Sequence, residues 1–420
     1  MIDVIGTDAG APSSLTIAQQ QLIRQANVIA APTRLHAALQ SWLNTVEIEL
    51  IASDDPRKLC AALSRTTSAV VLASGDPLWF GIGRILIDRL GPKRLRFHPS
   101  PTSLQLAFAR LGRPWQDAEW LSLHGRDPAV LARELQKRPA ALAVLTDPDQ
   151  GGAETVRRML HSSGLSATYQ LWVCEKLGHP EERVRHFAVD GPLPDDLPRL
   201  LITLLIAEPP PPTEPTSLPL FGLDDGLFLQ HPDHPGLMTK REVRIQLLAD
   251  LQLPQHGVLW DLGAGTGSVG LEALRIRPEL RLLAIERRGG GAELIHANAE
   301  RLGVKPTAVL EKDVLHLSDD DIPNNLKHPE RVLLGGGGLH RSELLRFVLS
   351  RLAAGGMVVI PLATIEAVGE LRSLLEQEQM IVQLTQLQAW RGQPLSDGTR
   401  LAPLNPSLIL KGTKSTPIEH

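Results

Sequence analysis

The segment LWDLGAGTGS, residues 259–268, decides the fold of the second half of this chain. Its apolar start predicts a buried strand, and the apolar spacing that follows it predicts a helix. The three glycines between them let backbone amides approach a ligand closely, because no Cβ stands in the way. Residues 281–286 then predict a second strand that ends in Glu286, and an acid at that point accepts hydrogen bonds from a ribose.

The spacing of these glycines narrows the choice of ligand. Nicotinamide and flavin folds use G-x-G-x-x-G, but the last glycine of that pattern would fall at Ser268. The pattern G-x-G-x-G, with Asp261 two residues before it, resembles the class I S-adenosylmethionine (SAM) methyltransferases. A glycine-rich turn without a ligand and a nicotinamide enzyme are the alternatives.

The composition of the chain limits the number of domains, the partners and the location that can be expected. The chain has 420 residues, 43% of them hydrophobic, so two globular domains are expected. A net charge of −4 gives no electrostatic reason to expect nucleic acid as a partner. The two cysteines, Cys60 and Cys174, predict no disulfide framework and no bound metal, and they favour a cytoplasmic location. The apolar run 200–207 is far shorter than the roughly 18 residues of a membrane span, so no membrane association is expected.

A proline-rich segment divides the chain. Residues 208–215 read EPPPPTEP, which predicts a semi-rigid linker. We therefore expect domains at 1–207 and 218–420, joined by a linker at 208–217. Both halves alternate predicted strands and helices, which indicates α/β architecture. In the second half the predicted strands are 258–262, 282–286, 308–311, 331–334 and 357–362, with 381–390 and 407–411 as a final antiparallel pair. This order predicts a seven-stranded doubly wound, Rossmann-like sheet with a ligand at the carboxyl ends of its strands.

Several motifs of the first half resemble the tetrapyrrole methylase family, in the branch that acts on precorrin-6Y in cobalamin (corrin) biosynthesis. They are GDPLWFGIG at 75–83, PTSLQLAFARLG at 101–112, SLHGR at 122–126, LTDP at 145–148 and WVCEKLG at 172–178. The resemblance implies a SAM site at Gly75, Asp76, Phe80, Thr102 and Ser103. Taken singly, the Gly-Asp-Pro segment also fits an ordinary turn, and Thr102-Ser103 fits a helix cap.

One loop of the first half departs from that family. Its members usually carry G-x-G-P-G after the first strand, whereas residues 6–10 read GTDAG and place Asp8 in the loop. The departure leaves open an alternative in which the first half is a degenerate, non-catalytic scaffold.

The second half resembles the decarboxylating methyltransferase partner of the same family. The motifs are LMTKREVR at 237–244, the glycine turn, NAERLGV at 298–304 and GGGG at 335–338. The resemblance implies SAM contacts at Thr239, Gly263, Ala264, Gly265, Thr266, Gly267, Glu286, Asp313 and Val314. With both halves fused, it implies a bifunctional enzyme that uses one SAM per domain.

The implied reaction methylates precorrin-6Y at C5 and C15 and decarboxylates its C12 acetate chain, giving precorrin-8. The cobalt-precorrin equivalent, a decarboxylating second half alone, and methylation of another small molecule or an RNA base are the alternatives. The catalytic residues stay unassigned. Lys240, Arg244, His124 and Arg126 are candidates for handling substrate carboxylates or protons, since a tetrapyrrole carries many carboxylates. We also expect a homo-oligomer.

Overall fold

The computed structural model describes residues 1–44, 48–79, 82–231, 233–335, 338–394 and 398–415. The chain forms two compact units. The first unit comprises Met1–Leu131, Pro139–Arg157 and Gln170–Ala207, and the second comprises Ala132–Arg138, Arg158–Tyr169 and Glu208–His420. No helix in the described ranges is long and apolar enough to cross a membrane.

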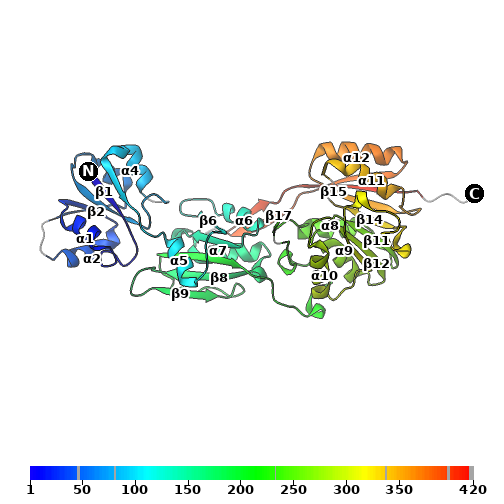
Figure 1. The fold of residues 1–420 in the computed structure, drawn as a ribbon, viewed down its shortest axis with the longest axis horizontal. Helices are drawn as coiled ribbons and strands as arrows, with labels where there is room; N and C mark the ends of the chain where they lie inside the picture. The colour runs from blue at the N-terminus through cyan, green and yellow to red at the C-terminus, as the bar shows by residue number, and fades with distance from the viewer. Residues whose placement is uncertain (45–47, 80–81, 232, 336–337, 395–397, 416–420) are drawn as a thin grey trace, which may run out of the picture. The chain divides into compact units, whose positions relative to one another are not determined.

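Two five-stranded sheets organise the first half of the sequence (Figure 1). The order is β3-β2-β4-β1-β5 in one sheet and β6-β7-β10-β8-β9 in the other. The strands are β1 (Ile2–Thr7), β2 (Val28–Ala31), β3 (Glu49–Ala52), β4 (Ala69–Ser74), β5 (Leu95–His98), β6 (Ala118–Ser122), β7 (Ala141–Leu145), β8 (Tyr169–Glu175), β9 (Arg183–Phe187) and β10 (Leu201–Ala207). The helices are α1 (Ile17–Arg24), α2 (His36–Leu43), α3 (Pro56–Ser64), α4 (Gly83–Leu90), α5 (Ser103–Leu111), α6 (Ala129–Gln136) and α7 (Gly152–Ser162).

A seven-stranded sheet organises the second unit, as the sequence predicts. Its order is β13-β12-β11-β14-β15-β19-β16. The strands are β11 (Gly257–Leu262), β12 (Leu280–Glu286), β13 (Ala308–Glu311), β14 (Arg331–Leu334), β15 (Met357–Leu362), β16 (Ile381–Leu387) and β19 (Ser407–Thr413). β11 to β15 pair in parallel, whereas β19 is antiparallel to both β15 and β16. The order reverses between β11 and β14, which places a ligand-binding crevice beside the end of β11.

Helices cover both faces of this sheet (Figure 1). α8 (Arg241–Asp250), α9 (Ser268–Ile276) and α10 (Gly291–Leu302) pack on one face, and α11 (Arg341–Leu349) and α12 (Ile365–Gln377) pack on the other. Strand β11 contributes side chains to the cores on both faces of the sheet. Leu259 packs in the core with α8, α9 and α10, and Trp260 packs in the core with α11 and α12. The indole N–H of the fully buried Trp260 donates to the carbonyl of Leu326 at 2.8 Å. The strand that leads into the glycine turn is therefore rigidly held.

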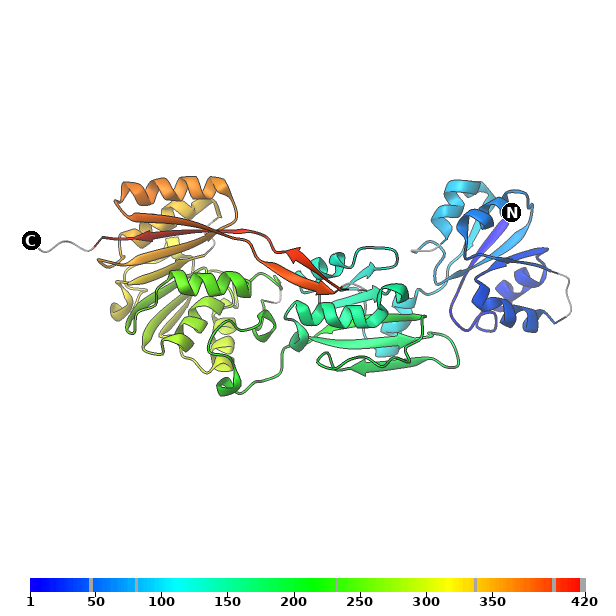
Figure 2. The ribbon, with the colours of Figure 1, turned by 180° about the vertical axis from the view of Figure 1, so that it is seen from behind.

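One expected strand is wrong in its extent. Residues 381–390 were expected to form one strand, but β16 ends at Leu387. Trp390 begins a separate hairpin of β17 (Trp390–Pro394) and β18 (Thr399–Pro403). Figure 2 shows this red hairpin as a two-stranded ribbon apart from the seven-stranded sheet. Pro394 and Pro403 each lack an N–H, which suits positions at the ends of short strands.

Candidate functional site

The three glycines of the turn serve three different purposes. Gly263 (φ 70°) allows close packing, since a Cβ there would lie 2.4 Å from the carbonyl oxygen of Gly335. Gly267 (φ 76°) is the N-cap of α9, and a Cβ there would lie 3.2 Å from Ile295 Cγ2. Gly265 (φ 58°) differs, because no described atom lies within 4 Å of an added Cβ. Gly265 therefore borders open space, as a glycine that approaches a ligand should.

Glu286 at the end of β12 is tied to this turn. Its Oε2 accepts a hydrogen bond from the amide of Gly265 at 2.8 Å, and its Oε1 accepts one from the amide of Arg288 at 3.0 Å. The carboxylate is almost completely buried within the protein. The acid that the sequence predicts for ribose binding thus also fixes the backbone of the turn.

Asp261 supports the turn from below. Its Oδ2 accepts a hydrogen bond from the amide of Gly270 at 3.0 Å, which joins β11 to α9. Burial raises the pKa of Asp261 to about 7, and the nearby charge of Glu286 adds to the rise, although the bond from Gly270 opposes it. The folded protein therefore holds a proton on Asp261 at pH values where the unfolded chain has released it.

Asp261→Asn is expected to flatten the pH dependence of stability. Between about pH 4 and pH 7 the folded state binds the extra proton, so raising the pH costs the wild type about 1 kcal/mol of unfolding free energy per unit. Asparagine does not titrate, so this slope should disappear. Hydrogen exchange of β11 amides at pH 5, 6 and 7 measures it, and the exposed carboxyl variant Asp320→Asn is the control. An unchanged slope in Asp261→Asn would contradict the assignment.

A cavity of about 580 Å³ lies at the carboxyl end of the sheet in the second unit. Its volume falls within the range of small-molecule sites, roughly 300–1,000 Å³. The structure brings most of the predicted SAM contacts together in its lining: Thr239, Gly263, Ala264, Gly265, Thr266, Glu286, Asp313 and Val314. Gly267 is not in the lining, because it caps and packs α9 instead.

Thr266 in the lining carries a buried hydroxyl group without a partner among the described residues. Thr266 is only 3% exposed, yet its Oγ1 has no hydrogen-bond partner in the described part of the chain. Its carbonyl, by contrast, accepts from Asn298 Nδ2 at 3.0 Å. Buried hydroxyls are rarely left unpaired. An unpaired hydroxyl, the open space at Gly265 and the carboxylate of Glu286 together fit a nucleoside-containing cofactor such as SAM.

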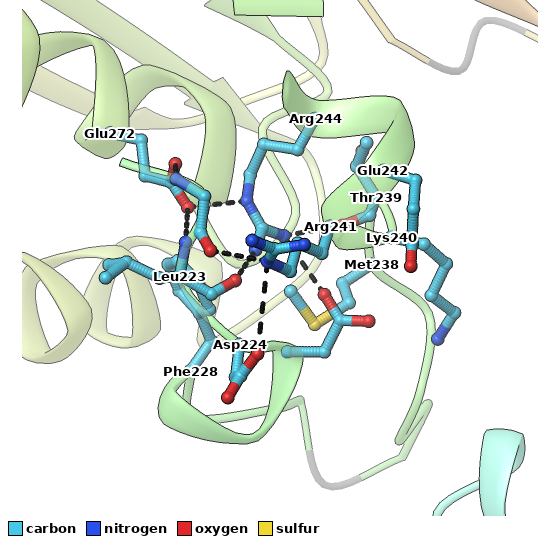
Figure 3. Close-up of polar contacts among 12 residues, drawn as sticks. Leu223, Asp224, Phe228, Met238, Thr239, Lys240, Arg241, Glu242, Arg244 and Glu272 are labelled. Carbon is cyan, nitrogen blue, oxygen red and sulfur yellow. Dashed lines mark hydrogen bonds and ion pairs between the residues drawn. The ribbon is translucent and has the colours of Figure 1, made fainter. Parts of the chain in front are cut away.

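Arg244 is not in the lining of the cavity. Figure 3 shows its side chain beside Glu272 and Leu223. Its guanidinium is fully buried and donates to Glu272 Oε1 at 2.6 Å, to Asp225 Oδ1 at 3.3 Å and to the carbonyls of Thr239 and Leu223. These protein acceptors occupy the guanidinium, so Arg244 is not placed to bind a substrate carboxylate. It instead fixes the backbone of Thr239, one of the predicted SAM contacts.

Glu272 and Asp225 extend this network. Glu272, on α9, accepts hydrogen bonds from the amides of Gly222 at 2.6 Å and Leu223 at 3.2 Å. Asp225 also accepts from Arg391 Nη2 at 3.4 Å. The buried charges therefore connect α8, α9, the segment around residue 223 and the hairpin that contains Arg391.

Lys240 is the basic candidate that does line the cavity. It is the N-cap residue of α8, and Figure 3 shows its side chain extending away from the Arg244 guanidinium. Its Nζ donates to the carbonyl of Gly236 at 3.1 Å. Burial lowers the pKa of Lys240 below its ordinary value, and Arg391 and Arg244 lower it further, whereas Asp225 raises it. A lysine in this setting can exchange a proton more readily than one in water.

The predicted site of the first unit is only partly assembled. A cavity of about 220 Å³ is lined by Gly75 and Ser103 together with Asp8. Thr102 instead caps α5, with its Oγ1 accepting from the amide of Gln105 at 3.2 Å.

Asp76, His124 and Arg126 are not in the lining of this cavity. Asp76 accepts from the amide of Leu78 at 2.8 Å. His124 and Arg126 are exposed and do not line the cavity, and His124 Nδ1 is 3.9 Å from Asp147 Oδ2. Phe80 lies outside the described residues.

Asp8, the departure from the family loop, holds that loop together. Its Oδ1 accepts hydrogen bonds from the amide of Gly10 at 2.9 Å and from the hydroxyl of Ser14. A Cβ on Gly178 would lie 2.5 Å from Asp8 Cγ, so the side chain packs directly against that glycine.

Within the described residues no group of three or more His, Cys, Asp or Glu side chains could hold a metal ion.

Two family models match the chain. Residues 1–190 match the tetrapyrrole (corrin/porphyrin) methylases, and residues 231–414 match the precorrin methyltransferase domain. A precorrin-6Y C(5,15)-methyltransferase (decarboxylating) from Sinorhizobium sp. is 33% identical over 361 residues, which cover 85% of this chain and 83% of the relative. This chain belongs to the precorrin-6Y C(5,15)-methyltransferase (decarboxylating) family.

A second full-length relative and a solved structure of about half the length are also similar to this chain. The Mycobacterium tuberculosis (strain CDC 1551 / Oshkosh) relative of the same name is 28% identical and covers 97% of this chain and 98% of its own. A solved precorrin-6Y C5,15-methyltransferase structure from Geobacter metallireducens GS-15 has 27% identity and a TM-score of 0.42, covering 47% of this chain and all of that one. The family assignment confirms the resemblance seen in the sequence, and with it an enzyme of the methyltransferase class.

Several residues of the site were missed from the sequence. Asp225, Glu272, Arg391 and Gln393 carry no local motif. Arg391 pairs with Glu242 across 149 residues of sequence, and Arg244 pairs with Glu272 across 28. Glu272 stands within the largely apolar sequence of α9, and an acid at such a position is a sequence signal that a cation packs against it.

Proposed function

We propose that this precorrin-6Y methyltransferase methylates precorrin-6Y at C5 and C15 and decarboxylates its C12 acetate chain. The observation that carries the proposal is the cavity of the second unit, which joins the glycine turn and Glu286 to Lys240. The names of the full-length relatives support both the substrate and the decarboxylation. A relative from Pyrobaculum aerophilum, named as a probable cobalt-precorrin-6B C(15)-methyltransferase (decarboxylating), aligns with 45% of this chain, so half of the chain is long enough for this activity, which we assign to the second unit.

The protein's part in methyl transfer is alignment. When bound, SAM supplies an electrophilic methyl group. The turn at Gly265 and the carboxylate of Glu286 would hold the cofactor, while Thr239 is fixed from behind by Arg244. Fixing the donor in line with the acceptor carbon and excluding water is sufficient for such a transfer, because the electron-rich tetrapyrrole carbon is itself the nucleophile.

Lys240 is proposed to serve the decarboxylation. Its ammonium in a partly desolvated wall can hold the acetate carboxylate, and its lowered pKa suits proton exchange with the macrocycle. Lys240→Met is expected to lower kcat for CO2 release by about 10²–10³, with SAM affinity unchanged. Lys240→Arg keeps the positive charge. It should therefore retain more of the binding of the acetate carboxylate than of the proton transfer. Single-turnover assays of CO2 release measure this, and equal CO2 release by Lys240→Met and wild type would exclude the role.

The first unit is proposed to hold a second SAM and to methylate C5. Gly75 and Ser103 line its cavity, but the cavity of about 220 Å³ is smaller than most ligand sites. Titration calorimetry of the full chain with SAM distinguishes a first unit that binds SAM from one that serves only as a scaffold. Two equivalents per chain support two centres, whereas one equivalent that is lost with Gly265→Arg supports a scaffolding first unit.

Incubation with SAM and precorrin-6Y, followed by mass spectrometry, tests the whole proposal. Gain of two methyl groups with loss of CO2 is the expected result. One methyl group with loss of CO2 would limit the activity to the second unit, and turnover of the cobalt-containing substrate alone would favour the cobalt-precorrin alternative. A cytoplasmic location and a homo-oligomeric state stay predictions.

A further inference from the structure

The hairpin of β17 and β18 turns one of its faces to the cavity of the second unit. Arg391 pairs with Ala402 across the two strands, and residues paired in this way project to the same side of a hairpin. Arg391, Gln393 and Ala402 all line the cavity. Trp390 and Leu401 are exposed, at 54% and 63% of their surface. The face of the hairpin that carries Arg391 and Gln393 is therefore polar, whereas Trp390 and Leu401 on the other face are apolar and exposed.

Arg391 fixes this polar face in place. Its Nε and Nη2 donate to the two carboxylate oxygens of Glu242 at 2.8 and 2.7 Å, which is a bidentate ion pair. Its Nη2 also lies 3.4 Å from Asp225 Oδ2. Glu242 belongs to the first turn of α8, two residues after Lys240. The hairpin is thus attached to the element that presents Lys240 to the cavity.

Gln393 carries a side-chain oxygen on this face that is unpaired within the described part of the chain. It is 8% exposed, and its Oε1 has no hydrogen-bond partner among the residues that the structure describes. Leaving a buried amide oxygen unpaired costs about 1–3 kcal/mol, so such atoms are normally satisfied by a neighbour or a ligand. Because Gln393 lines the cavity, we expect its side chain to turn toward a donor on a molecule that binds there.

The geometry points to Gln393 as a positioning residue that accepts a hydrogen bond from a ring N–H of the metal-free tetrapyrrole. This inference rests on the proposed function. The predicted SAM contacts lie on the glycine turn, β12 and residues 239 and 313–314, and none of them lies on the hairpin. The carboxylates at the rim of the substrate are acceptors only, and so cannot satisfy an amide oxygen. A macrocycle that has bound cobalt through its ring nitrogens has lost these protons, so Gln393 would discriminate between the two forms.

The test compares two variants on two substrates. Gln393→Met keeps the volume but removes the amide, and it is expected to raise KM for precorrin-6Y about tenfold, with kcat and the Kd for SAM unchanged. The affinity for the cobalt-containing form, measured as substrate or competitive inhibitor, should stay the same. Gln393→Glu retains an oxygen acceptor and should restore most of the affinity for precorrin-6Y. Leu401→Ala, on the exposed face of the same hairpin, is the matched control.

Three results would overturn the inference. Unchanged KM in Gln393→Met would mean that water satisfies the amide. An equal loss for both substrates would mean that Gln393 contacts a group other than a ring N–H, and a weakened Kd for SAM would place its partner on the cofactor. Failure of the wild-type chain to methylate either substrate would instead refute the proposed function itself.

Discussion

Gly265→Arg is expected to abolish SAM binding by the second unit, weakening its affinity by at least about 100-fold. Gly265 borders open space within the cavity, and its amide is held by Glu286 at 2.8 Å. An arginine side chain would project from the turn into the space that the cofactor needs. Calorimetric titration of the full chain with SAM measures the loss, and the activity assay should show loss of CO2 release.

Gly290→Arg separates this steric effect from backbone strain. Gly290 has φ 76°, is exposed and also has no described atom within 4 Å of an added Cβ, but it does not line the cavity. Both variants place arginine at a left-handed position, at a similar conformational cost. SAM affinity should therefore survive in Gly290→Arg. If Gly265→Arg bound SAM as tightly as the wild type, the cofactor would have to lie elsewhere.

Arg244→Met is expected to lower the unfolding free energy of the second unit by about 3–5 kcal/mol. The side chains of Arg244 and Glu272 are both fully buried, and Asp225 beside them is nearly so. Removing the guanidinium leaves two carboxylates without their main cation in a region of low dielectric. Hydrogen exchange of β11 amides reports the stability of this unit separately from that of the first unit.

Two comparisons test the cause of that loss. The double variant Arg244→Met with Glu272→Leu removes both charges, so it should recover part of the stability lost in Arg244→Met. Arg372→Ala breaks the exposed pair with Glu376 and should change stability by less than about 1 kcal/mol. A loss in Arg244→Met no larger than that in Arg372→Ala would show that the buried network does not hold the unit together.

The fold of the second unit was largely predictable because its signals are local. The glycine turn, the apolar strand before it and Glu286 after it lie within one βαβ unit, and β11 and β12 form where they were expected. The hairpin was missed because Ala389 and Trp390 continue the apolar character of β16, so the break after Leu387 has no glycine or proline to mark it. β3 carries no comparable signal, because its four residues are exposed or only partly buried and show little alternation.

The residues of the candidate site were predictable only where they belong to one local sequence motif. Lys240 and Arg244 are four residues apart and looked equivalent, yet only Lys240 lines the cavity. They differ because Glu272 and Asp225 bind the guanidinium of Arg244. These two acids reach Arg244 only through the packing of α9 and of the segment around residue 225 against α8. The place of Gln393 in the site could not be predicted from the sequence either. It depends on the position of the hairpin, which is fixed by the pair between Arg391 and Glu242.

The order of the strands in the seven-stranded sheet has a consequence for synthesis of the chain. β19 lies between β15 and β16, although residues 407–413 follow both in sequence. While the chain leaves the ribosome, β15 therefore presents an unpaired edge, and β16 lacks its partner until β19 emerges. An open edge of this kind invites pairing with other chains. The edge of β15 is consequently open to such pairing until residues 407–413 have been synthesised, whereas in the folded chain β19 covers it.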